Sequence, residues 1–368
     1  MRRRYPPAVL AAMLGLALAT GGASLATAPA PDPSAAAMQE AARIMAEGTA
    51  VIRRARLARG LVTNPRTDPN RTGLIGAEWT TTTTTLGSLA SKRTSTNPNL
   101  AAGLVRWLRE AGVREGSAVA VGASGSFPGL ALGTIAAVRA LGGRPITITS
   151  VGASSWGANE PGFTWLDMEV ELERAGLATR SMGASLGGED DDGAGLGPDA
   201  RRQLLAAIAR SVVPLLPGEA RLPGAPLLSG VPLSDRVAAR MAAYDAASGG
   251  PIAAFVNIGG AAANIGTCLG VLNLRPGVHR GLPPCRGEPG VMWRMSARGV
   301  PVLHLLHVEG IAAAFGLPVD PVPLPELGRG APFQRPSRGR SGALLLVLLA
   351  GLLALVHHHR LHWNQPGR

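Results

Sequence analysis

Short apolar runs alternate with stretches of helical period through the middle of the chain. Short runs rich in Val, Ile and Ala are typical of strands buried on both faces, and the stretches between them predict covering helices. The predicted strands are 117–122, 145–152, 177–185, 251–260 and 300–310, and the predicted helices are 127–141, 163–176, 198–213, 233–247 and 311–316. This alternation predicts an α/β fold: an open, mostly parallel sheet with helices on both faces, in a Rossmann-like three-layer arrangement.

The first third of the chain is helical and rich in threonine. Residues 35–60 place Met38, Ala42, Met45 and Ile52 on one side of a predicted amphipathic helix, and a second helix is predicted over 99–112,. Between them, 79–99 contains six consecutive threonines, which are poor helix formers and indicate a strand or a loop,. Two interpretations remain open: a low-complexity loop, or a polar wall in which hydroxyls, Lys92 and Arg93 face an anionic ligand.

Both ends of the chain carry apolar segments. Residues 1–30 combine Arg2–Arg4, an apolar stretch and Ala26-Thr27-Ala28, which is typical of a signal anchor or a cleaved signal peptide,. A Pro- and Arg-rich linker, 326–341, precedes the uncharged apolar run 342–357, which predicts a C-terminal transmembrane helix,. The expected organisation is thus a 35–112 helical and Thr-rich part and a 113–325 α/β domain between two membrane helices.

The arginines at the two ends suggest how the chain is oriented in a membrane. Arg2–Arg4 favour a cytoplasmic N-terminus, which places the globular part outside the cytoplasm on the bacterial cell membrane,. Arg335, Arg338 and Arg340 would then lie on the outer side and argue against this orientation.

The charge distribution argues against nucleic-acid binding. The net charge of +12 is concentrated at the extremities, since residues 5–334 hold 28 basic and 24 acidic side chains. Arginines interleaved with aromatics are absent from the sequence, so a nucleic-acid partner is not expected. Cys268 and Cys285 have no zinc-ligand spacing and are able to form one disulfide outside the cytoplasm,.

Every predicted strand ends in glycine or small polar residues. In an open parallel sheet the carboxyl ends share one edge, where ligands bind, and glycines let backbone amides approach them closely. Helix N-termini at this edge favour anions. The residues that the sequence predicts to bind ligand are Lys92, Arg93, Gly122, Ser124, Gly125, Ser126, Ser154, Ser155, Trp156, Asn159, Asn257, Gly259, Gly260 and Asn264.

Several unusual segments together resemble one protein family. They are "DPNRTGLIGAEWT", "TTTLGSLASKRTSTNPN", "VGASGSFPGL", "SVGASSWGANEPGFTWLDME" and "VNIGGAAANIG", spread over roughly residues 65–320. They are similar to the poly-γ-glutamate system protein family, membrane-associated bacterial proteins found with the poly-γ-glutamate (capsule) synthesis machinery. The resemblance implies a membrane location, an anionic γ-glutamyl ligand and other subunits of that machinery as partners, but it carries over no catalytic residue.

Candidate chemistry is sparse. Gly122–Ser126 matches the G-x-S-x-G nucleophile elbow only in part, because the second glycine comes one position early,. Ser124 with His307 is a candidate catalytic pair; the alternative is that the serines cap a helix or bind ligand by hydrogen bonds. Asp190 and Asp192 are candidate ligands for Ca²⁺ or Mg²⁺, and a solvated loop is the alternative,.

Two functions follow from the sequence. The first is a membrane-anchored accessory component of poly-γ-glutamate biosynthesis and export that binds an anionic γ-glutamyl chain in a glycine-rich crevice. The second is a serine-dependent amidohydrolase or transferase acting on that polymer. A nucleotide-binding function lacks both G-x-G-x-x-G and a Walker lysine, and the sequence identifies no cofactor,.

Overall fold

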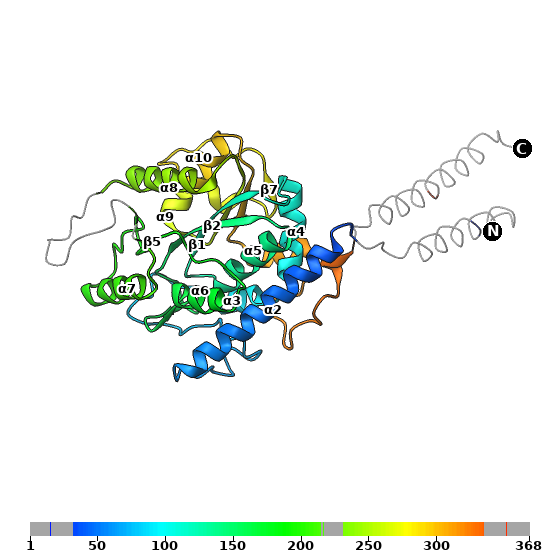
Figure 1. The fold of residues 1–368 in the computed structure, drawn as a ribbon, viewed down its shortest axis with the longest axis horizontal. Coiled ribbons are helices and arrows are strands. Elements are labelled where there is room, and N and C mark those ends of the chain that lie inside the picture. The colour runs from blue at the N-terminus through cyan, green and yellow to red at the C-terminus, as the bar shows by residue number, and fades with distance from the viewer. Residues whose placement is uncertain (1–14, 16–31, 215, 217–230, 335–350, 352–368) are drawn as a thin grey trace, which may run out of the picture. The chain divides into compact units, whose positions relative to one another are not determined.

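A six-stranded sheet lies at the centre of the described part of the chain (Figure 1). The structure, a computed structural model, describes Gly15, 32–214, 216, 231–334 and Gly351. The strand order is β5-β2-β1-β6-β8-β7, and all neighbours are parallel except β7 and β8. The strands are β1 (Ala118–Ser124), β2 (Arg144–Ser150), β5 (Gly183–Ser185), β6 (Ile252–Ile258), β7 (Val278–His279) and β8 (Val302–Leu305), with a separate hairpin of β3 (Asn159–Glu160) and β4 (Phe163–Thr164). The predicted α/β fold with an open, mostly parallel sheet is confirmed.

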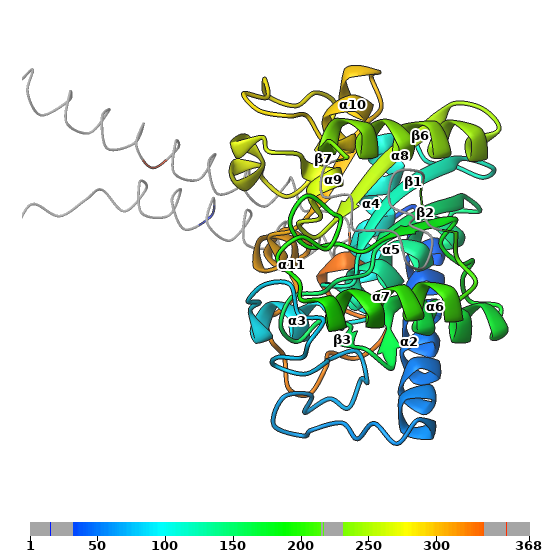
Figure 2. The same cartoon turned by 90° about the vertical axis from the view of Figure 1, so that its left-hand side faces the viewer.

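Helices cover both faces of this sheet (Figure 2). They are α2 (Ala35–Ala58), α3 (Leu89–Ser95), α4 (Asn99–Ala111), α5 (Pro128–Ala140), α6 (Trp165–Arg174), α7 (Pro198–Arg210), α8 (Leu233–Ser248), α9 (Ala262–Ile265), α10 (Val291–Ala297) and α11 (Val308–Phe315). Side chains of β1 alternate between the faces: Val119 and Val121 join the core with α2, α4 and α5, whereas Ala118 and Ala120 join the core with α8 and α10,. The central parallel strand β1 is therefore buried at every position, as its nearly continuous apolar run predicts,.

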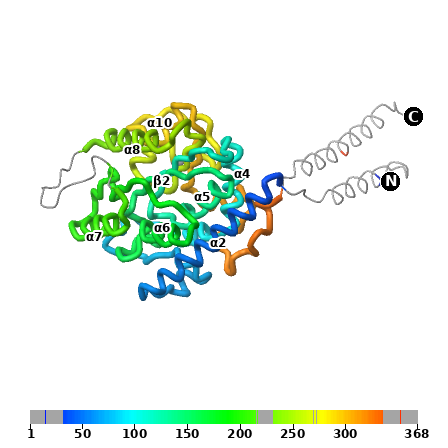
Figure 3. The backbone as a smooth tube through the Cα atoms, viewed as in Figure 1, coloured from blue at the N-terminus to red at the C-terminus, as the bar shows by residue number. Residues whose placement is uncertain are grey.

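The N-terminal helices belong to the same compact unit as the sheet, which spans Pro33–Phe333. Met38, Met45 and Ile52 of α2 are fully buried, as the amphipathic pattern predicts. Figure 3 shows α2, in blue, beside α5, and the two helices are in contact. Gly48 permits this approach, since a Cβ there would lie 2.8 Å from Leu132 Cδ1.

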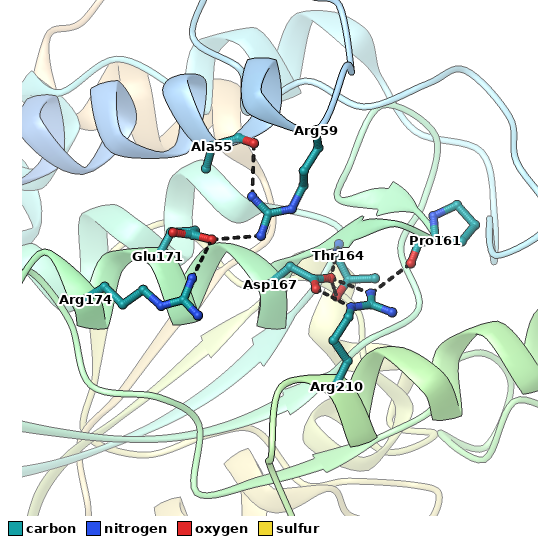
Figure 4. A network of polar contacts seen from close by, with 8 residues as sticks. All are labelled: Ala55, Arg59, Pro161, Thr164, Asp167, Glu171, Arg174 and Arg210. Atoms are coloured by element: carbon teal, nitrogen blue, oxygen red, sulfur yellow. Dashed lines mark hydrogen bonds and ion pairs between the residues drawn. The ribbon is translucent and has the colours of Figure 1, made fainter.

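Ion pairs connect three helices on this side of the molecule (Figure 4). Arg59, just after α2, donates to Glu171 of α6 over 2.8 Å, and Arg59 holds the pKa of that carboxyl below its usual range. Arg210 of α7 donates to both carboxylate oxygens of Asp167, over 2.6 and 2.9 Å. Asp167 also accepts the amide of Thr164 and so completes a capping box at the start of α6,.

The predicted membrane helices are not supported by the described residues. The segments 1–30 and 342–357 lie outside the described part of the chain, apart from Gly15 and Gly351. Within that part, no helix combines the length and the apolar character that a bilayer crossing requires,.

The sheet order reverses at β1. The chain runs from β1 to β2 and β5 on one side, and then returns to place β6 and β8 on the other. The loops that follow β1 and β6 therefore diverge at the carboxyl edge, which is where open α/β sheets bind ligands.

A disulfide joins Cys268 to Cys285, as the sequence allows. It ties the segment after α9 to the loop before α10, near the end of β6.

Candidate functional site

A cavity of about 480 Å³ opens at this carboxyl edge. The loops after β1, β2, β5, β6 and β8 all contribute to it, together with the segment that leads into α3. The lining residues are Thr84, Thr85, Leu86, Gly87, Lys92, Ser124, Ser126, Phe127, Ser150, Gly152, Ser154, Gly187, Gly188, Glu189, Gly260, Ala261, Ala262 and Leu306. The small-residue loops that the sequence places at separate strand ends thus meet around one crevice.

Three serines form a hydrogen-bonded chain along one wall of the crevice. Ser126 donates its amide to Ser124 Oγ over 3.2 Å, and Ser154 donates its amide to Ser126 Oγ over 3.0 Å. Gly125 is required between the first two serines because a Cβ there would lie 2.4 Å from the carbonyl oxygen of Val151. The loop after β1 is thereby locked against the loop after β2.

Lys92 enters the same wall from α3. Its Nζ donates to Ser154 Oγ over 2.7 Å and to the carbonyl oxygen of Ser126, and it lies 3.8 Å from the centroid of the Phe127 ring. The side chain is only 2% exposed. Burial lowers the pKa of the Lys92 amine to about 7, because the charged form loses its hydration and no carboxylate among the described residues forms an ion pair with it,.

A second buried cation lies below the crevice. Arg240 of α8 pairs with Asp191, and both side chains are fully buried. Arg240 also donates to Ser185 Oγ over 2.6 Å and to Ser150 Oγ over 3.1 Å, and Ser150 donates to Asp191 over 2.6 Å. Because Ser150 lines the cavity, this network forms part of its floor.

Asn257 and His304 occupy paired positions on β6 and β8 rather than the crevice. Asn257 Nδ2 donates to His304 Nδ1 over 2.8 Å and to the carbonyl oxygen of Gly259 over 2.8 Å. Burial lowers the pKa of His304 to about 4, so the ring is neutral and carries its proton on Nε2,. Asn264 accepts a 3.5 Å hydrogen bond from Arg240 and fills the space beside Gly122.

Ser124 and His307 line different cavities. His307 and Glu309 line a smaller space of about 170 Å³ with His304. His307 Nδ1 accepts the amide of Gly310 over 3.2 Å and caps α11, whereas Ser124 Oγ accepts the amide of Ser126. No hydrogen bond joins Ser124 to His307, both of which the structure describes, so the geometry brings them together neither as nucleophile and base nor in one cavity.

The aspartates after β5 are engaged by arginines and amides. Asp192 accepts from Arg236 over 2.9 Å and from the amide of Ala194 over 2.7 Å. The carbonyl oxygen of Asp190 accepts from the same guanidinium over 2.5 Å. The described residues contain no group of three His, Cys, Asp or Glu side chains placed to hold a metal ion.

The other predicted ligand-binding residues divide into two groups. Lys92, Ser124, Ser126, Ser154 and Gly260 line the crevice. Those outside its lining are Arg93, Gly122, Gly125, Ser155, Trp156, Asn159, Asn257, Gly259 and Asn264.

Asn159 and Arg93 have structural partners instead. Asn159 anchors the threonine segment: its Nδ2 donates to Thr83 Oγ1 over 2.9 Å, and its carbonyl oxygen accepts from Thr82 over 2.7 Å. Arg93 forms a bidentate ion pair with Asp320. The threonine run therefore has two roles: Thr82 and Thr83 bind Asn159, whereas Thr84 and Thr85 line the crevice.

The Arg240 network was not predicted from the sequence. One signal was present, because Arg236, Arg240 and Tyr244 recur at four-residue spacing in an alanine-rich helix, which puts three large polar side chains on one face,. All three prove to be buried. Their partners after β5 had no comparable signal.

Fold and site together define a class: an α/β protein with a serine- and glycine-lined crevice at the switch point of its sheet. Compared with protein families, with characterised proteins and with solved structures, the chain has no match.

Proposed function

We propose that this protein is a membrane-anchored accessory component of poly-γ-glutamate biosynthesis and export that binds anionic γ-glutamyl chains in the crevice. The family resemblance of the sequence suggests poly-γ-glutamate as the polymer, and the chemistry of the crevice supports an anionic ligand. The observation that carries the proposal is Lys92, a buried amine on the cavity wall with no carboxylate partner among the described residues.

The rest of the lining suits carboxylates as well. Ser124, Ser126, Thr84 and Thr85 offer hydroxyl donors, and α5 begins at Pro128, directly after the lining residue Phe127. The first amides of a helix are unpaired within it and favour negative charge. Glu189 is the only acidic side chain among the described lining residues, and it is exposed, so repulsion of an anion is small.

We further propose that segments 1–30 and 342–357 anchor the chain, with Pro33–Phe333 outside the cytoplasm. The charged and apolar pattern of the two ends supports anchoring,. The Cys268–Cys285 disulfide supports an oxidising compartment,. Other subunits of the synthesis machinery are the expected protein partners.

Binding of a synthetic γ-glutamyl pentamer to the purified full-length chain, measured by calorimetry, tests the proposal. Affinity should increase as the pH falls from 8 to 6, because Lys92 gains its proton in this range,. Lys92→Met should weaken binding about tenfold or more, the order of a hydrogen bond to a charged group. A pentamer with its carboxylates converted to amides is the matched control, and equal binding of this neutral compound would contradict the proposal.

Deleting the gene in its own host tests the biological part. Surface poly-γ-glutamate should fall in amount or change in length, and the full-length gene should restore it. Unchanged polymer in the deletion strain would remove the accessory function even if the pentamer binds in solution.

A further inference from the structure

Ser154 and Lys92 combine the features of a nucleophile and its general base. Their Oγ and Nζ atoms lie 2.7 Å apart, within the range for direct proton transfer,. Both residues line the 480 Å³ cavity, so a bound substrate reaches them. Both are nonetheless shielded from bulk water, with exposures of 5% and 2%.

We propose that Ser154 and Lys92 form a nucleophile–base pair that cleaves or transfers amide-linked acyl groups held in the crevice. The identity of the acyl group, a γ-glutamyl unit, rests on the proposed function above. The pair replaces Ser124 and His307, which the fold keeps in separate cavities.

The contacts of the amine leave its lone pair available to Ser154 in the neutral form. Nζ also contacts the carbonyl oxygen of Ser126, which only an N–H can satisfy,. In the neutral amine the remaining lone pair is then free to accept the Ser154 hydroxyl proton. The Phe127 ring, 3.8 Å from Nζ, stabilises the ammonium ion that this transfer creates,.

Burial supplies the neutral amine. It lowers the pKa of Lys92 to about 7, so half of the molecules carry a free base near neutral pH,. Two carboxyl groups lie in this region. Glu189 lines the same cavity and is exposed, while Glu309 of α11 accepts the hydroxyl of Ser91, the residue before Lys92. Neither forms an ion pair with the amine in the part of the chain that the structure describes.

Hydrolysis needs water as its only co-substrate, and transfer needs an acceptor amine in place of water. Ser154 Oγ attacks the amide carbonyl carbon while its proton moves to Lys92 Nζ. The C–N bond then breaks, and the departing amine takes that proton, which leaves an ester on Ser154. Water, or the amine of another chain in a transfer, attacks the ester and gives its proton to Lys92, which returns it to Ser154 Oγ.

Ser126 stabilises the developing negative charge in this scheme. Its Oγ accepts the amide of Ser154 over 3.0 Å and keeps its own proton, which is free to be donated to the carbonyl oxygen as negative charge develops there,.

Covalent labelling of the full-length chain with a fluorophosphonate probe tests the pair, with the adduct located by peptide mass spectrometry. We expect the adduct on Ser154, with a rate that rises between pH 6 and 8 and then levels off as Lys92 loses its proton. Ser154→Ala should abolish it, and Lys92→Met should slow it by about 100-fold or more, the range for loss of a general base. Ser211→Ala is the matched control, because this buried serine has no partner for its Oγ among the described residues and should label at the wild-type rate.

An adduct on another residue, or wild-type labelling of Lys92→Met, would overturn the pair. If Lys92→Met does not fold, Ser154→Ala and the pH profile of the wild type test the pair instead. A wild-type labelling rate that is flat between pH 6 and 8 would also overturn the pair.

The pentamer separates this proposal from the proposed function. Pentamer binding without labelling of Ser154 would support the γ-glutamyl ligand and contradict the nucleophile–base pair. The opposite result is labelling of Ser154 with neither pentamer binding nor release of 4-nitroaniline from γ-glutamyl 4-nitroanilide. This result would support the pair and contradict the γ-glutamyl ligand.

Discussion

Two of the cations that are buried at the carboxyl edge of the sheet, Arg240 and Lys92, have opposite surroundings. Arg240 lies against Asp191, Ser150 and Ser185, so a carboxylate matches its charge. Lys92 faces a hydroxyl, a carbonyl oxygen and an aromatic ring, and none of the carboxylates that the structure describes forms an ion pair with it. The first cation holds the strand ends together, whereas the second lines the cavity and has a pKa near 7.

Burial therefore gives one cation a structural role and makes the other chemically reactive. A guanidinium cannot lose its proton in a protein, so its burial requires a permanent partner. An amine without such a partner gives up its proton instead, and that makes it a base or a switchable anion site.

Removing the partner of Arg240 should be the most damaging change. Asp191→Ala leaves an uncompensated buried guanidinium, and we expect the free energy of unfolding to fall by about 3–5 kcal/mol. Urea denaturation followed by circular dichroism measures it. Asp245→Ala is the control, since Asp245 and Arg298 are each about half exposed and should contribute less than about 1 kcal/mol,. Equal losses of unfolding free energy in the two variants would show that the buried Arg240 pair stabilises the fold no more than an exposed pair does.

Lys92 should make stability depend on pH in a defined direction. Its folded pKa of about 7 lies below the ordinary value of 10.5, so between these values the unfolded chain binds more protons. Stability must then rise with pH across this window, and the destabilisation is complete below about pH 7. Lys92→Met removes this pH dependence. The free energy of unfolding of the variant minus that of the wild type should therefore decrease from pH 7 to pH 9.5 in urea titrations. A constant difference would mean that Lys92 keeps its proton when buried.

Arg93, the next residue, should matter least. Its guanidinium is paired with Asp320, and both side chains are partly exposed. Arg93→Gln should lower the free energy of unfolding by about 1 kcal/mol or less and leave pentamer affinity unchanged, in contrast to Lys92→Met. Calorimetry on the two variants side by side is the measurement, and a similar loss of affinity in both would assign the anion site to the whole basic dipeptide.

The sequence predicted the repeated βα units because continuous apolar runs and helical periods are local signals. The predicted strand 251–260 and helix 99–112 correspond closely to β6 and α4. The six consecutive threonines, 80–85, were expected to form a strand or a loop and lie outside any helix, whereas α3, which begins at Leu89, was not among the predicted helices. Ser88 caps its first turn, and Lys92, Thr94 and Ser95 are buried by neighbouring elements, so tertiary contacts outweigh weak helix propensity,.

The candidate site was predicted only at the level of loops. Glycine and serine after each apolar run indicated the crevice, because parallel strands must bring their carboxyl ends to one edge. Ser124 and Ser126 were identified in this way, and so was Ser154. The pairing of Ser154 with Lys92 could not be, since the two residues are 62 positions apart and nothing local relates them.

The layered architecture, the alternation of strand and helix, and the small residues at the strand ends can be read from the chain, because they depend on periodicity and local conformation. Which polar groups meet was settled by the tertiary structure. It matched Arg240 with Asp191, it placed Lys92 beside Ser154 with no ion-pair partner among the described residues, and it put Ser124 and His307 in the linings of different cavities. The physical reason is that burial and electrostatic pairing depend on distances in space, which the order of residues along the chain does not specify.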